Sequence, residues 1–177
     1  MEEFPMIETN RLFMRELTLD DAESIYRHFS YHEVTKFMDI EACKDIHEAV
    51  DIITFHIHDS GCRYGLFGKD KNELIGTCGF HCWIKDEEET RAEIGFDLSP
   101  DYWGKGFMQE ALHELIPIGF NLMKLDCIEA TTEIENVQSQ RLLEKMGFTK
   151  EPDLKDRLMY FTLYKNQNRR MIQEGIE

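Results

Sequence analysis

The expected order of helices and strands predicts an α/β (α+β) chain with one mixed, mostly antiparallel sheet and helices on both faces. Two segments near the start repeat apolar residues at helical spacing, and a long middle stretch has the composition and turn signals of strands. The C-terminal part then changes between helix and strand. No repeat or linker interrupts this order, and 177 residues suit one domain, which we assign to residues 1–177.

The first part of the chain predicts a strand followed by two helices. Residues 8–15 have strand character, and Thr18-x-x-Asp21 has the form of a capping box that begins a helix from Thr18 to Ser30. A stripe of Ile46, Val50, Ile53 and Ile57 predicts a second helix with one buried face.

Three strands are expected next, at Arg63–Phe67, Glu73–Trp83 and Arg91–Leu98, with a turn at 68–72 and an acidic loop at 86–89. Their short connections indicate an antiparallel meander.

Two helices and two strands complete the chain. Apolar spacing predicts a helix from Met108 to Leu122, in which Pro117 is expected to cause a kink. A strand at Asp126–Thr132 follows, then a helix at Asn136–Met146 that Gly147 ends, and a last strand near Leu158–Tyr164.

The loop Tyr102-Trp103-Gly104-Lys105-Gly106 leads directly from a strand into a helix. Its glycines allow the backbone to approach a ligand, and the first helical turn presents unpaired N–H groups at the positive end of the helix dipole. The segment therefore predicts a site for a phosphate-bearing ligand. The spacing fits neither the P-loop nor the dinucleotide fingerprint, where Gln109 stands in place of a small residue.

This loop resembles the pyrophosphate-binding motif of the GNAT acetyltransferases, Gln/Arg-x-x-Gly-x-Gly/Ala, with Trp103, Gly106 and Met108 at its three signature positions. The resemblance extends over nearly the whole chain and is to the RimJ/RimL-like branch. It includes residues 8–15 with 17–22, the strand 92–96, Gln109-Glu110-Ala111-Leu112, and Asn136-x-x-Ser139 followed by residues 142–148.

The resemblance implies a GNAT-like fold that takes acetyl-coenzyme A (acetyl-CoA) as cosubstrate. The pyrophosphate is then expected to bind backbone N–H groups of the loop, namely Trp103, Gly104, Lys105, Gly106, Phe107 and Met108. The pantetheine arm is expected between the strands 91–98 and 126–132, where a backbone N–H of Phe96 to Leu98 faces the thioester carbonyl. Gly95 suits a bulge or a close backbone approach.

Ser139 and Asn136 match family positions near the coenzyme. Ser139 is expected to protonate the departing thiolate, and Asn136 to contact the coenzyme. The alternatives are that Asn136 is only a helix N-cap and that Ser139 is an ordinary residue of the first turn.

Strand alternation puts Glu93 and Asp97 on one side of their strand, so both are candidates to receive a proton from an acceptor amine. We favour Glu93, because carboxylates on this strand serve that role in several GNAT enzymes. The competing interpretations are a surface pair with Arg91 or a pair across the sheet. Tyr160 and Tyr164 are possible acids, although packing roles are more usual.

Composition restricts the partners. A net charge of −15 excludes nucleic acid as a favoured partner and mildly favours a cationic substrate. Five cysteines without framework spacing and no apolar leader indicate a cytoplasmic setting, and no run is long enough to span a membrane.

His56 and His58 lie two apart in a predicted helix, so we expect no metal site with His47 or Cys43.

Two smaller expectations concern the second strand of the meander. Cys78 and Cys82 are expected to share one face as buried, unbridged side chains, and His81 is expected either to line the acceptor pocket or to be a satisfied, partly buried histidine.

The sequence thus predicts an acetyl-CoA-dependent N-acetyltransferase that acts by direct attack of a primary amine, either a protein N-terminus or a small molecule, with a homodimer possible. One alternative is a coenzyme-binding sensor without turnover, favoured by Met108 and by the lack of a clear glutamate base near the last strand. Another is a transferase for longer acyl groups.

Overall fold

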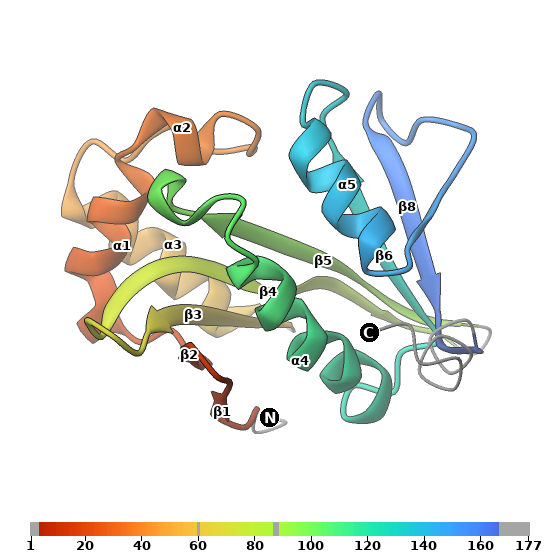
Figure 1. The fold of residues 1–177 in the computed structure, drawn as a ribbon, viewed down its shortest axis with the longest axis horizontal. Helices are drawn as coiled ribbons and strands as arrows, with labels where there is room; N and C mark the ends of the chain where they lie inside the picture. Colours follow the sequence, from red (N-terminus) through yellow and green to blue (C-terminus); the bar gives the residue numbers. More distant parts are fainter. Residues whose placement is uncertain (1–3, 60, 87–88, 167–177) are drawn as a thin grey trace.

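A computed structural model describes residues 4–59, 61–86 and 89–166. The described strands form one sheet, and helices precede and follow its central meander (Figure 1). In chain order the elements are β1 (Ile7–Glu8), β2 (Leu12–Glu16), η1 (Leu19–Asp21), α1 (Ala22–Phe29), α2 (His32–Thr35), α3 (Ile46–His58), β3 (Cys62–Gly68), β4 (Glu73–Lys85), β5 (Thr90–Leu98), η2 (Pro100–Tyr102), α4 (Phe107–Asn121), β6 (Cys127–Thr132), α5 (Val137–Lys145), β7 (Thr149–Lys150) and β8 (Met159–Tyr164).

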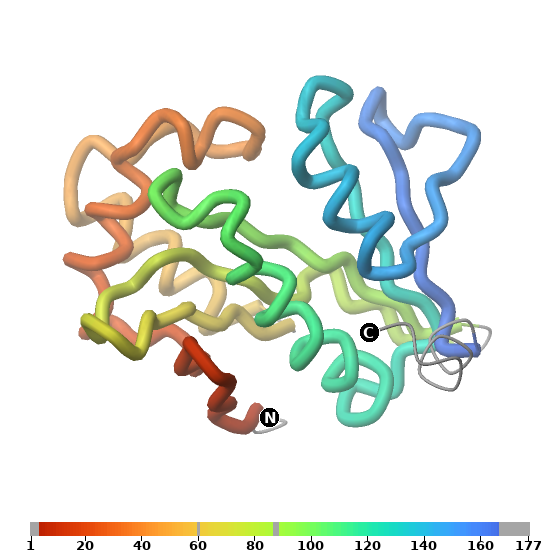
Figure 2. Tube along the Cα trace, in the orientation of Figure 1, coloured from red at the N-terminus to blue at the C-terminus, as the bar shows by residue number. Residues whose placement is uncertain are grey.

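The described strands make an eight-stranded sheet in the order β1-β2-β3-β4-β5-β6-β8-β7. Neighbours pair antiparallel except β5 and β6, which pair parallel through α4 as the crossover. Their parallel pairing ends at Glu93 and Glu129. Beyond that pair, β6, β8 and α5 diverge from β5 and the start of α4, as the trace shows (Figure 2). We call this divergence the β5–β6 split.

Two hydrophobic cores lie on opposite faces of the sheet. The larger core packs α4 and α5 against even-numbered strand residues such as Met14, Phe80 and Ile94. The smaller core joins α1 and α3 around Ile25 and Ile53. The predicted mixed sheet with helices on both faces is confirmed.

The first strand is divided, unlike the single strand predicted. The backbone N–H of Thr9 donates to Leu12 O and the Leu12 N–H donates to the Thr9 hydroxyl, which turns the chain between β1 and β2. The capping box of Thr18 and Asp21 is present, but the first turn after it is a 3-10 turn, η1, before α1 begins. The short helix α2 was not predicted.

Other expectations were mostly confirmed. Gly147 adopts a φ of 86° just after α5, as a left-handed cap requires. Pro117 lies inside α4, which continues past it to Asn121, and the kink at this residue stays a prediction. The acidic loop predicted at 86–89 lies partly outside the described residues. No described helix has both the length and the apolar character needed to cross a membrane.

Cys78 and Cys82 are unbridged, as expected, but the expectation that both are buried on one face of β4 was wrong. Cys78 is fully buried, whereas Cys82 is exposed. A bulge between His81 and Ile84 interrupts the strand alternation, and Cys82 has a φ of 52° there. Gly95, where a bulge or a close backbone approach was expected, pairs regularly with Gly79 and has no bulge. The bulge lies instead in the neighbouring strand β4.

Candidate active site

The loop between β5 and α4 has the geometry of an anion site. Gly104 and Gly106 have φ values of 69° and 79°, a region that L side chains rarely adopt. The first intrahelical bond runs from the Glu110 N–H to Gly106 O, so the three preceding N–H groups have no acceptor within the helix. These donors stand at the positive end of α4. Such donors suit a phosphate-bearing ligand, and pyrophosphate binding at this loop stays a prediction.

Two residues between β1 and β2, Thr9 and Arg11, contact this loop and the first turn of α4, and we call these contacts the brace. Arg11 donates to Lys105 O at 2.9 Å and forms an ion pair with Glu110 at 2.6 Å, and its guanidinium lies 4.0 Å from the centre of the Phe107 ring. Thr9 donates to the same Glu110 carboxylate at 2.6 Å. Although burial acts in the opposite direction, hydrogen bonds from Thr9 and Arg11 lower the pKa of Glu110 below its ordinary value. Sequence analysis missed this brace.

Trp103 and Met108 have distinct places in the loop. The indole Nε1 of Trp103 donates to Leu98 O at 2.6 Å, so this residue fastens the loop to the end of β5. The Met108 side chain is buried in the larger core. Met108 therefore offers only its backbone N–H to a ligand, and its side chain does not narrow the loop.

The backbone of β5 turns a row of polar groups toward the β5–β6 split. The Asp126 N–H donates to Thr90 O, and the Ser99 N–H donates to Ile75 O in β4. Since the direction of backbone groups alternates along a strand, even-numbered residues of β5 face β6 and odd-numbered residues face β4. Phe96 and Leu98 lie beyond the last β5–β6 pair, so their N–H groups face the split. A thioester carbonyl placed in the split can accept a hydrogen bond from either of these N–H groups.

Glu93 lies where the split begins. Its side chain is 19% exposed, accepts a hydrogen bond from the Thr131 hydroxyl, and has its second oxygen 3.9 Å from His81 Nε2. The alternative of an Arg91 surface pair is not what the structure contains, because Arg91 approaches Glu89 and Glu129 instead. The Glu93 side chain therefore lies on the face of the sheet that α1 and α3 cover, and it is partly accessible there.

His81 stands beside Glu93 in β4. Burial lowers the pKa of His81 below its ordinary value, with Glu93 acting in the opposite direction. A Cβ at Gly95 would lie 3.1 Å from the His81 ring and from Arg63, so the glycine provides the space in which these side chains pack. His81 is thus partly buried next to the candidate base.

Asp97, the second candidate for the base, is not accessible to an amine. Its side chain is 2% exposed and accepts hydrogen bonds from His28 at 2.5 Å, Arg63 at 2.6 Å and Thr77 at 2.5 Å. The remaining His28 nitrogen lies 2.9 Å from the Ser99 hydroxyl. The candidate was wrong because alternation identifies the face of a strand but not the partners that cover it. Asp97 instead ties α1 and β3 to the end of β5, just before the loop.

A second carboxylate, Glu129, lies directly across from Glu93 on β6. It accepts hydrogen bonds from the Tyr160 hydroxyl at 2.7 Å and from the Lys155 ammonium at 3.0 Å. Burial alone would raise the pKa of Glu129, but the hydrogen bonds from Tyr160 and Lys155 outweigh it and lower that pKa below its ordinary value. Burial, together with the hydrogen bond to Glu129, raises the pKa of Tyr160 above its ordinary value.

Asn136 and Ser139 begin α5, which borders the split opposite α4 (Figure 1). Asn136 is the N-cap, and its side-chain oxygen accepts from the Ser139 N–H at 3.2 Å. The capping role is therefore present, and the Asn136 amide nitrogen and the partly buried Ser139 hydroxyl are the groups left for a ligand.

The histidines that suggested a metal at first sight are separate. His58 Nδ1 lies 2.8 Å from Thr54 O within α3, and burial lowers the pKa of His56 to about 4. In the part of the chain that the structure describes, no group of three His, Cys, Asp or Glu side chains has the arrangement of a metal site.

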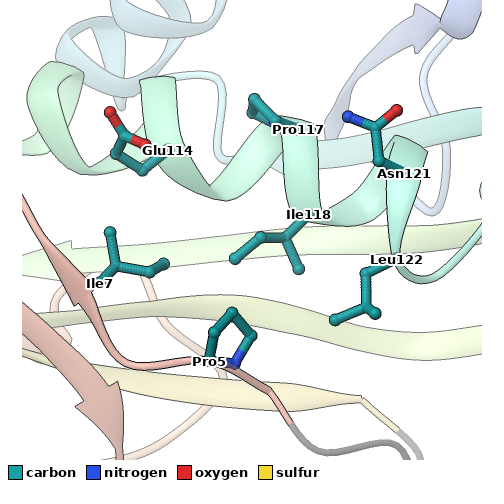
Figure 3. A pocket seen from close by; sticks show the side chains of 7 residues that line it. All are labelled: Pro5, Ile7, Glu114, Pro117, Ile118, Asn121 and Leu122. Atoms are coloured by element: carbon teal, nitrogen blue, oxygen red, sulfur yellow. The ribbon is translucent and has the colours of Figure 1, made fainter.

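A groove of about 560 Å³ lies elsewhere, between the first strand and the second half of α4. Pro5 and Ile7 form one wall and Pro117, Ile118 and Leu122 the other (Figure 3). The groove is at the opposite end of α4 from the glycine loop, and its lining is mainly apolar. The candidate catalytic residues Glu93 and Ser139 do not line this groove.

Comparisons with known proteins identify the family of the chain. The family model described as "Acetyltransferase (GNAT) domain" matches residues 11–149. An uncharacterized N-acetyltransferase, p20 of Bacillus licheniformis, is 41% identical over 152 residues, 84% of each chain. The [Ribosomal protein uS5]-alanine N-acetyltransferase of Escherichia coli is 31% identical over 105 residues, 59% of this chain and 54% of that one.

Solved structures share the fold. The spermidine N-acetyltransferase of Vibrio cholerae, in complex with CoA and spermine, superposes with a TM-score of 0.78 at 19% identity, over 91% of this chain and 99% of that one. The GNAT family uses acyl-CoA donors, and the glycine loop and the backbone edge of β5 fit such a donor. The chain therefore belongs to the GNAT acetyltransferases and is an N-acetyltransferase of the RimJ/RimL-like kind.

Proposed function

We propose that this N-acetyltransferase moves an acetyl group from acetyl-CoA directly to a primary amine, either a protein N-terminus or a small amine. The names of two relatives support these acceptor classes, since one acts on an alanine of a ribosomal protein and the other on spermidine. The net charge of −15 also favours a cationic acceptor.

The observation that carries the proposal is the position of Glu93. It is the last residue of β5 that pairs with β6, and three residues later the N–H of Phe96 faces the split. A strand rises about 3.3 Å per residue, so the Phe96 N–H lies roughly 10 Å along β5 from Glu93. The candidate proton acceptor and the nearer candidate oxyanion donor thus lie on the same strand, three residues apart.

The proposed reaction has one chemical stage. The neutral amine nitrogen attacks the thioester carbonyl carbon, a C–N bond forms and the C–S bond breaks. The amine proton passes to Glu93, directly or through one water, and is then released to solvent. The departing thiolate takes a proton from the Ser139 hydroxyl as that hydroxyl takes one from solvent, so the serine stays neutral. A backbone N–H of Phe96 or Leu98 stabilises the developing oxyanion, a contribution of about 3 kcal/mol per donor in other enzymes. The loop from Trp103 to Met108 holds the pyrophosphate.

The test is the Glu93→Gln variant, assayed for release of the CoA thiol with a panel of primary amines. We expect kcat to fall by about 10²-fold or more, because general base catalysis contributes that much, while titration calorimetry gives an unchanged Kd for acetyl-CoA. Glu73→Gln is the matched control, because Glu73 is exposed at the start of β4. Unchanged turnover by Glu93→Gln would reject Glu93 as the base.

The same assay addresses the two alternatives. Acetyl-CoA binding by the wild type without transfer to any amine would favour a sensor, although the burial of Met108 removes one of the two features that supported that interpretation. Faster transfer from propionyl- or succinyl-CoA would favour a longer acyl donor.

A further inference from the structure

Two carboxylates occupy facing positions on adjacent strands beside the split. His81, Glu93 and Glu129 are aligned by the β4–β5 and β5–β6 pairings, so the three side chains share one face of the sheet. Like charges in such positions repel each other unless a cation lies close. The two carboxylates therefore need different surroundings.

The surroundings do differ. Glu129 contacts the Lys155 ammonium at 3.0 Å, with the Arg91 guanidinium 3.8 Å away. Glu93 has the neutral Thr131 hydroxyl as its hydrogen-bond donor, and the His81 ring at 3.9 Å. Among the contacts of the described residues, positive charge is thus supplied to Glu129, and Glu93 receives a hydroxyl instead.

A strained turn holds Lys155 in this place. Lys155 and Leu158 exchange backbone hydrogen bonds across Asp156 and Arg157, whose φ values are 52° and 71°. Neither residue is a glycine, so each left-handed conformation is unfavourable. The Lys155 ammonium also lies 4.8 Å from the centre of the Tyr160 ring. The Lys155 side chain, which is 42% exposed, therefore lies between the Glu129 carboxylate and the Tyr160 ring.

We propose that the Lys155 ammonium occupies the position beside Glu129 that a second cationic group of an acceptor would otherwise take. Lys155 thereby makes the site selective for acceptors with a single positive charge near the reacting amine. This proposal rests on the proposed function, because it places the acceptor beside Glu93. Glu93 then faces the reacting amine, and a diamine gains nothing from Glu129 while Lys155 is there.

The experiment compares n-butylamine with 1,4-diaminobutane, which differ by the second ammonium group. Wild type, Lys155→Met and Lys155→Arg are assayed for kcat/KM and, by titration calorimetry, for Kd of each amine. Lys150→Met is the matched control, since it removes an exposed lysine on β7. We expect Lys155→Met to raise the preference for the diamine about tenfold in both measurements, and the other two variants to keep the wild-type ratio.

The two measurements separate the two proposals. A changed binding ratio without acetylation would support the role of Lys155 and count against the proposed transfer to these amines. A ratio for Lys155→Met within twofold of the wild type, or no measurable binding of the diamine to that variant, would overturn the role of Lys155.

Discussion

The buried network around Asp97 gives a quantitative prediction for Asp97→Asn. In the structure this carboxylate accepts hydrogen bonds from His28, Arg63 and both the hydroxyl and the N–H of Thr77. An amide keeps one acceptor oxygen and adds two donors, so several of these bonds are lost. Arg63, with a side chain only 9% exposed, would also lose its counter-charge.

The magnitude follows from that unpaired charge. Removing one partner of a buried ion pair costs about 3–5 kcal/mol. In a chain of this size each kcal/mol lowers Tm by roughly 2–4 °C, so the variant should melt about 6–20 °C below the wild type. Because the network also fixes Ser99 at the start of the glycine loop, acetyl-CoA binding should weaken as well.

The network also has a definite pH dependence. Burial alone would raise the pKa of Asp97, but hydrogen bonds from His28 and Thr77 and the charge of Arg63 lower it below its ordinary value. A carboxyl with a lower pKa in the folded state stabilises the fold above its unfolded-state pKa, and this stability is lost as the pH falls through the folded-state pKa. Asp97→Asn should lack that part of the acid dependence.

Urea unfolding at neutral and acidic pH measures both effects, with the exposed Asp153→Asn as the control. A loss of less than about 1 kcal/mol at neutral pH, or an acid dependence identical to the wild type, would refute the reasoning, because a buried unpaired arginine should cost more.

Two further predictions concern the ends of the two helices at the split. Trp103→Phe removes the bond from Nε1 to Leu98 O and should weaken acetyl-CoA binding about two- to tenfold by titration calorimetry, as expected for about 0.5–1.5 kcal/mol; unchanged affinity would exclude a role for this bond. Asn136→Ala should lose about 1 kcal/mol of unfolding free energy in urea because the cap of α5 is gone, whereas Asn136→Asp should keep the cap but bind the anionic coenzyme less tightly. Equal affinity for the coenzyme in Asn136→Asp and the wild type would leave Asn136 with the capping role alone.

Local features of the sequence predicted local structure well. The capping box at Thr18, the left-handed Gly147 and the glycine loop depend on residues within a few positions of one another, and each is where the sequence places it. The direction of the β5 backbone at Phe96 also follows from simple alternation.

The partners of the site residues could not be predicted in the same way. Arg11 and Glu110 are 99 residues apart, and His28 and Asp97 are 69 apart, so only the sheet order brings them together. Alternation indicated correctly that Glu93 and Asp97 share a face. It could not indicate that helix α1 covers Asp97 and leaves Glu93 open, which is why one candidate for the base was wrong.

The central claim is that the loop before α4 binds the donor. Titration calorimetry of acetyl-CoA into wild type, Gly106→Ala and Gly106→Glu tests it most directly. A Cβ at Gly106 meets only the end of the Arg11 side chain at 3.6 Å, so the alanine variant isolates the strain at φ 79°, and the glutamate variant adds bulk and negative charge. We predict micromolar binding by the wild type, weaker binding by Gly106→Ala and none by Gly106→Glu; equal binding by the two variants, or no binding by folded wild type, would contradict the account.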